Sequence, residues 1–201
     1  MCEEALRPST SPTSVIIAYH PPLFKPLRSL TLSNPLQTSL LKCIANGISI
    51  YSPHSALDAA TGGVNDWLAG GCNTDEILGL ASTVRISDIG EIKTQSEGKE
   101  VGVGRMVHFG RPVDLQAVIR AIKAHLSMDT GRHDCFAFFN KRADPGLVLV
   151  ELAQSPTGPS SISTIALCAG SGSSVIGQTP ADVYFTGEMS HVCSYLSPRI
   201  S

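Results

Sequence analysis

The chain has 201 residues, of which 42% are hydrophobic and 16% are charged, a composition typical of a globular protein with its own core. Its formal net charge is −2, which gives no electrostatic signature of binding to nucleic acid or to anionic membranes. No apolar run approaches the ~20 residues that cross a bilayer. We therefore expect a soluble globular protein with no role in binding nucleic acid or membranes.

The cysteines and the N-terminus both favour an intracellular protein. Six cysteines are scattered along the chain without any C-x-x-C pair, which argues against a zinc ribbon. The first residues include Glu3 and Glu4 and no apolar stretch, so they do not form a secretory signal. We expect reduced thiols and a cytoplasmic location, or a mitochondrial one if the true N-terminus is missing.

The order of apolar and polar segments predicts two α/β lobes. Residues 1–13 are rich in serine, proline and threonine and are expected to be a disordered lead. Residues 14–75 are expected to form a first lobe, and the polar segment 76–100 to link it to a second lobe at 101–191. Residues 192–201 are expected to be an unrelated tail.

The first lobe reads as strand, helix and strand. The apolar run Val15–Tyr19 predicts a strand that is buried on both faces. A helix follows, with Asn34 as its N-cap, Pro35 in its first turn and Gly47 as its C-terminal stop. Ile48–Tyr51 is the second strand, and a right-handed crossover makes the two strands a parallel pair.

The rest of the chain also mixes helices and strands. We expect mixed or parallel sheets flanked by helices, and so an α/β fold. The remaining expected elements, in chain order, are a short helix at 62–68, a strand at 101–107, a helix at 112–126, and strands at 135–139, 147–152, 163–167 and 181–185.

Three possible metal ligands follow the first two strands. His20 comes directly after the first, and His54 and Asp58 come after the second. Because parallel strands of a right-handed crossover end at the same sheet edge, these side chains are expected to converge there. Imidazole and carboxylate ligands suit zinc, iron, manganese or a similar divalent ion. In the alternative reading, His54 starts a helix, Asp58 caps it, and His20 faces solvent.

Two further segments carry polar groups that follow strands. The loop Gly170–Ser174 could form a nest of backbone N–H groups that holds phosphate, or it could be a tight structural turn. Glu188 and His191 could be a general acid or base, metal ligands, or ordinary groups on a helix surface.

Taken together, these segments resemble the Nif-three-like family, whose members are also labelled GTP cyclohydrolase I type 2 homologues. The resemblance covers roughly residues 14 to 191. The matching blocks are Ala18–Phe24, Ile50–His54 with Asp58, Gly63–Leu68, Gly102–Arg105, Ile122–Lys123, Ile165–Ser174, Ala181–Tyr184 and Thr186–His191.

The resemblance implies a two-lobed fold with a two-metal site between the lobes, and assembly into dimers and ring-like hexamers. His20 and Asp58 fall on metal ligands of the family, and His54, Glu188 and His191 fall on motifs that line the same cleft. Family members usually have a strand–helix region before the first histidine and a later His-x-x-x-Glu ligand pair. We therefore expect this chain to be truncated at both ends and its fold to be incomplete.

The resemblance implies a metal-dependent hydrolase that acts on a nucleotide or a phosphate ester, with Glu188 or His191 as proton carrier. A second hypothesis is a non-catalytic oligomeric scaffold or regulatory partner in which the metal serves structure. A third is an incomplete, inactive gene product that folds poorly alone, because uncovered sheet edges and apolar faces favour aggregation.

Overall fold

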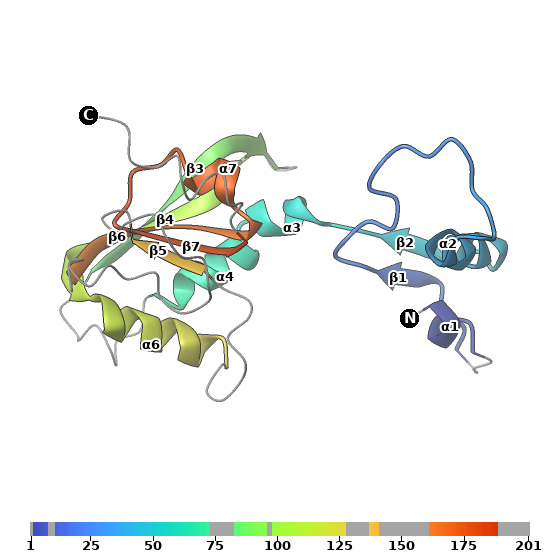
Figure 1. Ribbon diagram of the computed structural model, residues 1–201, viewed down its shortest axis with the longest axis horizontal. Helices are drawn as coiled ribbons and strands as arrows, with labels where there is room; N and C mark the ends of the chain where they lie inside the picture. The colour runs from blue at the N-terminus through green and yellow to red at the C-terminus, as the bar shows by residue number, and fades with distance from the viewer. Residues whose placement is uncertain are drawn as a thin grey trace. The chain divides into compact units, whose positions relative to one another are not determined.

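The structure, a computed structural model, describes residues 2–7, 11–72, 83–95, 98–127, 137–140 and 161–188. It consists of two compact units, Met1–Ala56 and Leu57–Ser201, which we call the N-terminal unit and the C-terminal unit (Figure 1). Both contain strands and helices, which confirms the expected α/β class. No helix in the described part of the chain is long and apolar enough to cross a membrane.

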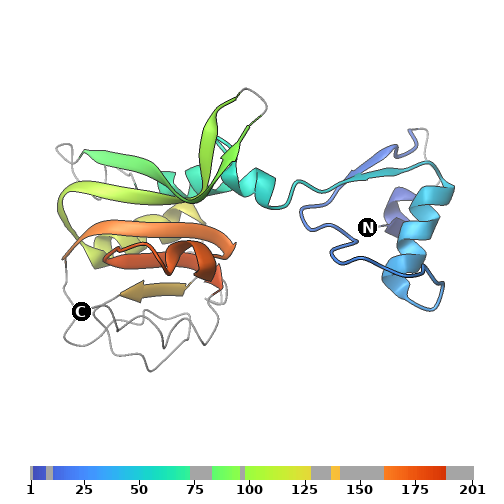
Figure 2. The ribbon, with the colours of Figure 1, turned by 90° about the horizontal axis from the view of Figure 1, so that it is seen from above.

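The N-terminal unit is built on a parallel pair of strands. Strand β1 (Val15–Ile17) pairs with β2 (Ser49–Tyr51) in a register that places Ile16 opposite Ile50. Helix α2 (Pro35–Ala45) lies between them in the chain and connects them (Figures 1 and 2). The predicted strand–helix–strand unit and its parallel pairing are confirmed.

Two expectations for this unit are wrong. The lead is not disordered throughout, because α1 (Cys2–Ala5) is helical and contacts α2. Strand β1 is not buried on both faces, since Val15 is 55% exposed and Ile17 is 72% exposed. Among the described residues, the sheet of this unit has only the two strands β1 and β2. An apolar run predicts a strand well, but it does not reveal what covers the strand.

The ends of α2 follow the sequence rules. The Oδ1 atom of Asn34 accepts hydrogen bonds from the backbone N–H groups of Leu36 (3.0 Å) and Gln37 (3.2 Å). Pro35 occupies the first turn, where its missing N–H costs no helical hydrogen bond. Gly47 has φ +67°, which permits the chain to turn sharply into β2.

The C-terminal unit is a five-stranded sheet with helices on both faces. The strand order is β3-β4-β6-β7-β5, in which β6 and β7 are parallel and the other neighbours are antiparallel. Helix α3 spans the boundary between the two units. The elements are α3 (Ser55–Ala59), α4 (Val64–Gly70), β3 (Val84–Thr94), β4 (Glu100–Asp114), α6 (Leu115–His125), β5 (Ala137–Asn140), β6 (Ser161–Ser171), α7 (Ser173–Ile176) and β7 (Val183–Glu188).

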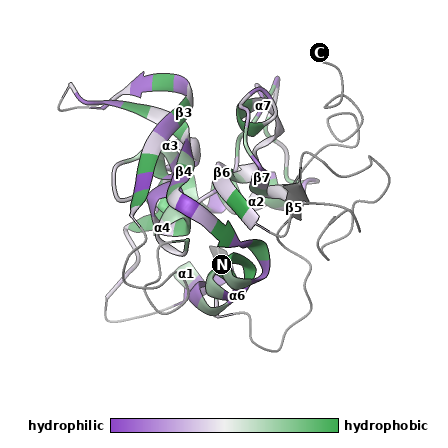
Figure 3. Cartoon of the chain, turned by 90° about the vertical axis from the view of Figure 1, so that its left-hand side faces the viewer, coloured by the Kyte–Doolittle hydropathy of each residue, from purple (hydrophilic) through white to green (hydrophobic). Residues whose placement is uncertain are grey.

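The strand alternation divides the core of this unit into two layers. Val107 and Leu167 pack with α4 and α6 on one face of the sheet, whereas Met106, Ala166 and Cys168 pack with α7 on the other. Figure 1 shows α6 and α7 on opposite sides of the sheet, and Figure 3 shows alternating hydrophilic and hydrophobic bands along β3 and β4. Successive side chains of a strand point to opposite faces, so each inner strand contributes to both layers.

Several expected boundaries need correction. The segment 76–100 is not simply a linker, because β3 occupies most of its described part. Strand β3 is an edge strand, so charged residues on it can remain in solvent while it pairs with β4. The helix expected from residue 112 begins at Leu115, because β4 runs on to Asp114, whose side chain caps α6. The strand expected at 147–152 lies outside the described residues.

Glycines in β4 are required by close backbone contacts. A Cβ atom on Gly104 would lie 2.8 Å from the Leu167 carbonyl oxygen, whereas one on Gly70 would meet nothing within 4 Å. We predict that Gly104→Ala lowers the free energy of unfolding by about 1–3 kcal/mol through overpacking. Gly70→Ala, the matched control in α4, should raise it by up to about 1 kcal/mol. Urea unfolding measures both, and equal effects would contradict this packing.

Candidate functional site

The two strands of the N-terminal unit bring His20 and His54 together. The backbone N–H of Ala18 donates to the Tyr51 carbonyl (2.9 Å), and the N–H of His54 donates to the Tyr19 carbonyl (3.2 Å), so pairing continues past the strand ends. The two imidazole ring centroids lie 5.6 Å apart. The prediction that both strands deliver histidine to the same edge is confirmed for this pair.

Aromatic rings surround the histidine pair. The Tyr19 ring lies 4.9 Å from that of His20 and 5.7 Å from that of His54, and Phe24 contacts His54 edge-on at 5.4 Å. His54 also has φ +44°, a left-handed conformation that costs a non-glycine residue about 1–3 kcal/mol. Such strained residues cluster at functional sites. The two imidazoles therefore contact each other and neighbouring aromatic rings, but His20 itself is exposed to solvent, as the alternative reading expects, and His54 is half-buried.

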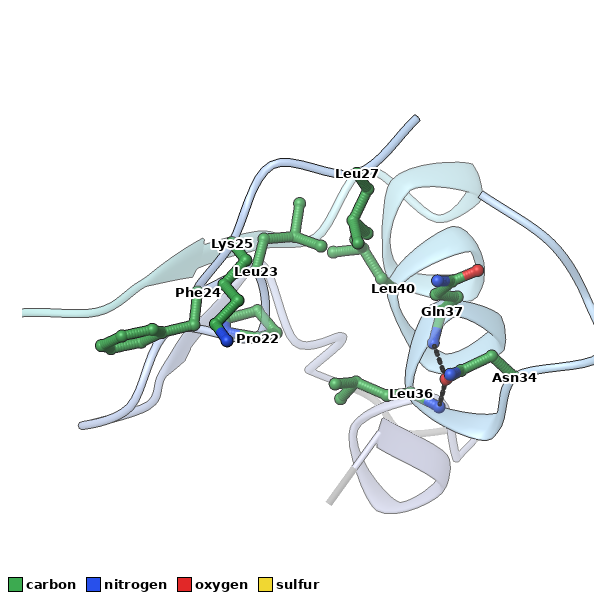
Figure 4. A pocket seen from close by; sticks show the side chains of 9 residues that line it. All are labelled: Pro22, Leu23, Phe24, Lys25, Leu27, Asn34, Leu36, Gln37 and Leu40. Carbon is green, nitrogen blue, oxygen red and sulfur yellow. Dashed lines mark hydrogen bonds between the residues drawn. The ribbon is translucent and has the colours of Figure 1, made fainter. Parts of the chain in front are cut away.

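A shallow apolar pocket lies in the chain segment that follows His20. It has a volume of about 300 Å³, and the segment 22–27 and helix α2 form its walls (Figure 4). Leu27 and Leu40 face each other across it, and Lys25 is the single charged residue in its lining. Its chemistry suits an apolar group better than a phosphate, which requires several donors or charges.

At one edge of the C-terminal unit, the glycine–serine loop after β6 meets the end of β7. Thr186 accepts a hydrogen bond from the Gly172 N–H (3.0 Å) and donates to the Gly170 carbonyl (2.9 Å). Gly170 has φ +64°, as a tight turn requires. Because Thr186 already binds an N–H group that a phosphate nest would use, these contacts favour the structural turn among the two readings of this loop.

Asp58 faces the same sheet edge. It is half-buried on α3, and its negative charge acts on the thiol of Cys168 in β6. Burial, together with this charge, raises the pKa of the Cys168 thiol to about 11. At neutral pH the thiol is therefore protonated and is a poor nucleophile.

A buried arginine holds the end of α3 to the sheet. Arg105 of β4 is only 3% exposed, and its Nη2 donates to the carbonyl of Ala59 (3.0 Å), the residue after Asp58. Its Nη1 donates to the carbonyls of Gly102 (2.7 Å) and Gly104 (3.0 Å) in its own strand. The guanidinium thus bridges α3 and β4.

Two carboxylates neutralise this arginine. The Nε of Arg105 donates to Asp66, and its Nη1 lies 2.9 Å from Asp88. Burial alone would raise the pKa of Asp66, but hydrogen bonds from Arg105 and from the Gly62 N–H (2.6 Å), with the charge of Arg105, lower it below 3.8. Asp66 is therefore ionised at neutral pH and forms a charge-assisted pair.

Asn65 completes this polar cluster and is fully buried. Its Nδ2 donates to the Val103 carbonyl (2.7 Å), and its Oδ1 accepts from the Ala169 N–H (2.8 Å). It therefore joins α4 to both β4 and β6. Sequence analysis assigned no role to Asn65, Asp66 or Arg105, although all three lie in blocks that resemble the family. The available signal was a charged residue, Arg105, inside the small and apolar run of β4.

The remaining site residues are placed only in part. Glu188 ends β7, opposite Ser171 of β6, and the described residues do not include its side chain or His191. His20 and Asp58 belong to different units, and their pairing stays a prediction. Within the described ranges, neither unit by itself groups three His, Cys, Asp or Glu side chains that could hold a metal ion.

Sequence comparisons find close relatives. The sequence model of the Duf34/NIF3 family (NGG1p interacting factor 3) matches residues 3–195. The chain is 38% identical over 194 residues to Protein NIF3 homolog of Schizosaccharomyces pombe, which covers 95% of the chain and 59% of that protein. It is 35% identical over 182 residues to NGG1-interacting factor 3 of Saccharomyces cerevisiae, and the match covers 89% of this chain and 56% of that protein. The chain thus spans less than two thirds of these relatives.

Solved structures share the fold. A Bacillus cereus protein related to NIF3 superimposes with a TM-score of 0.55 and 18% identity, covering 90% of this chain and 68% of that one. Reduced HcgD from Methanocaldococcus jannaschii gives a TM-score of 0.54 and 19% identity, and the match covers 92% of this chain and 58% of that one. These likenesses confirm the Nif-three-like fold expected from the sequence.

The ion pair of Asp66 predicts a pH dependence of stability. Because its pKa is lower in the folded state than 3.8, its contribution is present above that value and is lost as the pH falls through the folded pKa. We predict that Asp66→Asn flattens the fall in unfolding free energy below pH 3.8. Urea unfolding at successive pH values measures the slope, and identical slopes for both proteins would contradict the ion pair.

Proposed function

The chain belongs to the Duf34/NIF3 family, and we propose that it binds a divalent metal ion through His20, His54 and Asp58. The ion would be zinc, iron, manganese or a similar metal, because imidazole and carboxylate ligands suit all of these. We further propose hydrolysis of a nucleotide or a phosphate ester as the activity that this site serves.

The observation that supports this proposal is the histidine pair. Two imidazoles with centroids 5.6 Å apart, at the ends of paired parallel strands, form a ready pair of nitrogen donors. His54 has a left-handed backbone (φ +44°), which is strained for a residue other than glycine, and a role in a site gives a reason for retaining this strain. Asp58 would add an oxygen donor four residues further along the chain.

The residues of the site have separable roles in this proposal. A bound divalent ion would lower the pKa of a coordinated water and polarise the reacting group. The Tyr19 ring contacts the imidazole of His20, and the Phe24 ring contacts that of His54. Glu188 and His191 are the candidates for proton transfer to or from the substrate.

Metal titration tests the proposal directly. We expect the purified chain to bind Zn²⁺ or Co²⁺, and His20→Ala or His54→Ala to weaken that binding by more than tenfold through loss of a ligand. His108→Ala is the matched control, because His108 lies on β4 and bonds to Ser87. Isothermal titration calorimetry measures the affinities, and turnover of GTP and simple phosphate esters measures activity.

The outcome that contradicts the proposal is specific. A folded wild-type chain without metal affinity, or one whose affinity does not depend on His20, would rule out this site.

A second candidate function is protein association, either with a second copy or with another protein. A relative carries the name NGG1-interacting factor 3, and the N-terminal unit exposes large apolar side chains. Ile17 is 72% exposed and Tyr51 is 61% exposed on the two-stranded sheet. Exposed apolar side chains that gather on one surface commonly mark interfaces.

The buried free thiols Cys43, Cys72 and Cys168 fit a reducing compartment, and we propose the cytoplasm, with the mitochondrion as the alternative.

Self-association distinguishes this candidate. We expect the wild-type chain to form dimers or hexamers, and Ile17→Asp to shift it toward monomer, because a charge at the apolar surface opposes burial. Ile92→Asp, at a residue 52% exposed on β3, is the matched control. Analytical ultracentrifugation measures the assembly, and monomeric wild-type protein would argue against self-association.

A further inference from the structure

The buried polar cluster of Asn65, Asp66 and Arg105 lies outside the proposed ligand set but contacts its neighbourhood. Arg105 binds the carbonyl of Ala59, which directly follows Asp58 in the chain. Asp66 binds both Arg105 and the N–H of Gly62 in the turn after α3. These contacts hold the C-terminal end of α3 and the turn that follows it.

The packing around this turn leaves little freedom. The N–H of Gly63 donates to the Ala60 carbonyl (2.8 Å), and a Cβ on Gly63 would overlap the Leu57 carbonyl oxygen. Ala59 is 3% exposed. The backbone on both sides of Asp58 is therefore fixed by close contacts. The Asp58 charge acts on the thiol of Cys168 in β6.

Stability alone does not explain a buried arginine at this position. Burying a guanidinium costs several kcal/mol, and apolar replacements of buried ion pairs are often neutral or stabilising. Arg105 is 3% exposed and yet directs its donors to carbonyls in α3 and β4 and to two carboxylates. The planar N–H donors of a guanidinium fix the positions of the groups that they bind, here the backbone of α3 and β4, in a way that an apolar side chain does not.

We propose that Arg105 is a positioning residue for Asp58, an inference that rests on the proposed function. The guanidinium holds the α3–α4 turn against β4 and so orients the Asp58 carboxylate for metal binding. Asp66 orients the guanidinium in turn, through Nε. Outer partners that orient a metal ligand typically change metal affinity by about 10–100-fold when they are removed.

A double-mutant cycle separates positioning from simple stabilisation. The variants are Arg105→Lys, Asp58→Asn and their combination, with Arg120→Lys on the exposed surface of α6 as the matched control. Lysine keeps the charge but cannot reach the Ala59 carbonyl, Asp66 and the β4 carbonyls together. Co²⁺ titration, followed by its visible absorption, measures metal affinity, and urea unfolding measures stability in the same samples.

We expect Arg105→Lys to weaken Co²⁺ binding by about tenfold in the wild-type background and by less than twofold in the Asp58→Asn background. Arg105→Lys should lower the free energy of unfolding by a similar amount in both backgrounds, because the contacts that it removes do not involve the Asp58 side chain. Arg120→Lys should change neither quantity. If Arg105→Lys does not fold, Asp66→Asn takes its place in the same cycle.

Different failures identify different errors. If Arg105→Lys weakens Co²⁺ binding equally in both backgrounds, or does not weaken it at all, the inference about Arg105 is overturned. The proposed function still stands in that case if metal binding depends on His20. A wild-type chain that binds no Co²⁺ overturns both.

Discussion

The C-terminal unit buries the guanidinium of Arg105, a charge that must be neutralised and hydrogen-bonded for the unit to fold. It is buried in β4, its charge is balanced by Asp66 and Asp88, and it binds backbone carbonyls in its own strand and in α3. Without those partners a buried charge would oppose folding, so the turn between α3 and α4 must close for the arginine to be tolerated. The contact that stabilises the arginine therefore also fixes the backbone next to Asp58. Asn65, which joins β4 to β6, extends the same polar cluster across the sheet.

The N-terminal unit reaches a comparable result through backbone pairing. Parallel strands joined by one helix must end at the same edge, and the residues after them, His20 and His54, consequently become neighbours. No buried charge is needed there, since aromatic contacts with Tyr19 and Phe24 pack the rings. The two units thus hold the proposed ligands by different means: strand pairing places the two imidazoles, and a salt-bridged turn fixes the backbone next to the Asp58 carboxylate.

Local rules in the sequence predicted much of this architecture. The cap at Asn34, the stop at Gly47 and the parallel pairing of β1 with β2 depend on neighbouring residues and were predicted correctly. The exposure of β1 was not, because burial depends on which elements cover a strand. Strand β3 was missed because charged residues on an edge strand resemble a linker. The role of Arg105 was hidden because its partners at Ala59, Asp66 and Asp88 are distant in sequence.

The central proposal is that His20 and Asp58 bind the same divalent ion. Anomalous diffraction at the zinc edge, from crystals of the chain grown with Zn²⁺, tests it most directly. The account predicts an anomalous peak about 2.0–2.2 Å from an imidazole nitrogen of His20 and from a carboxylate oxygen of Asp58. Zinc bound at other residues, with His20 and Asp58 free of metal at saturating Zn²⁺, would contradict it.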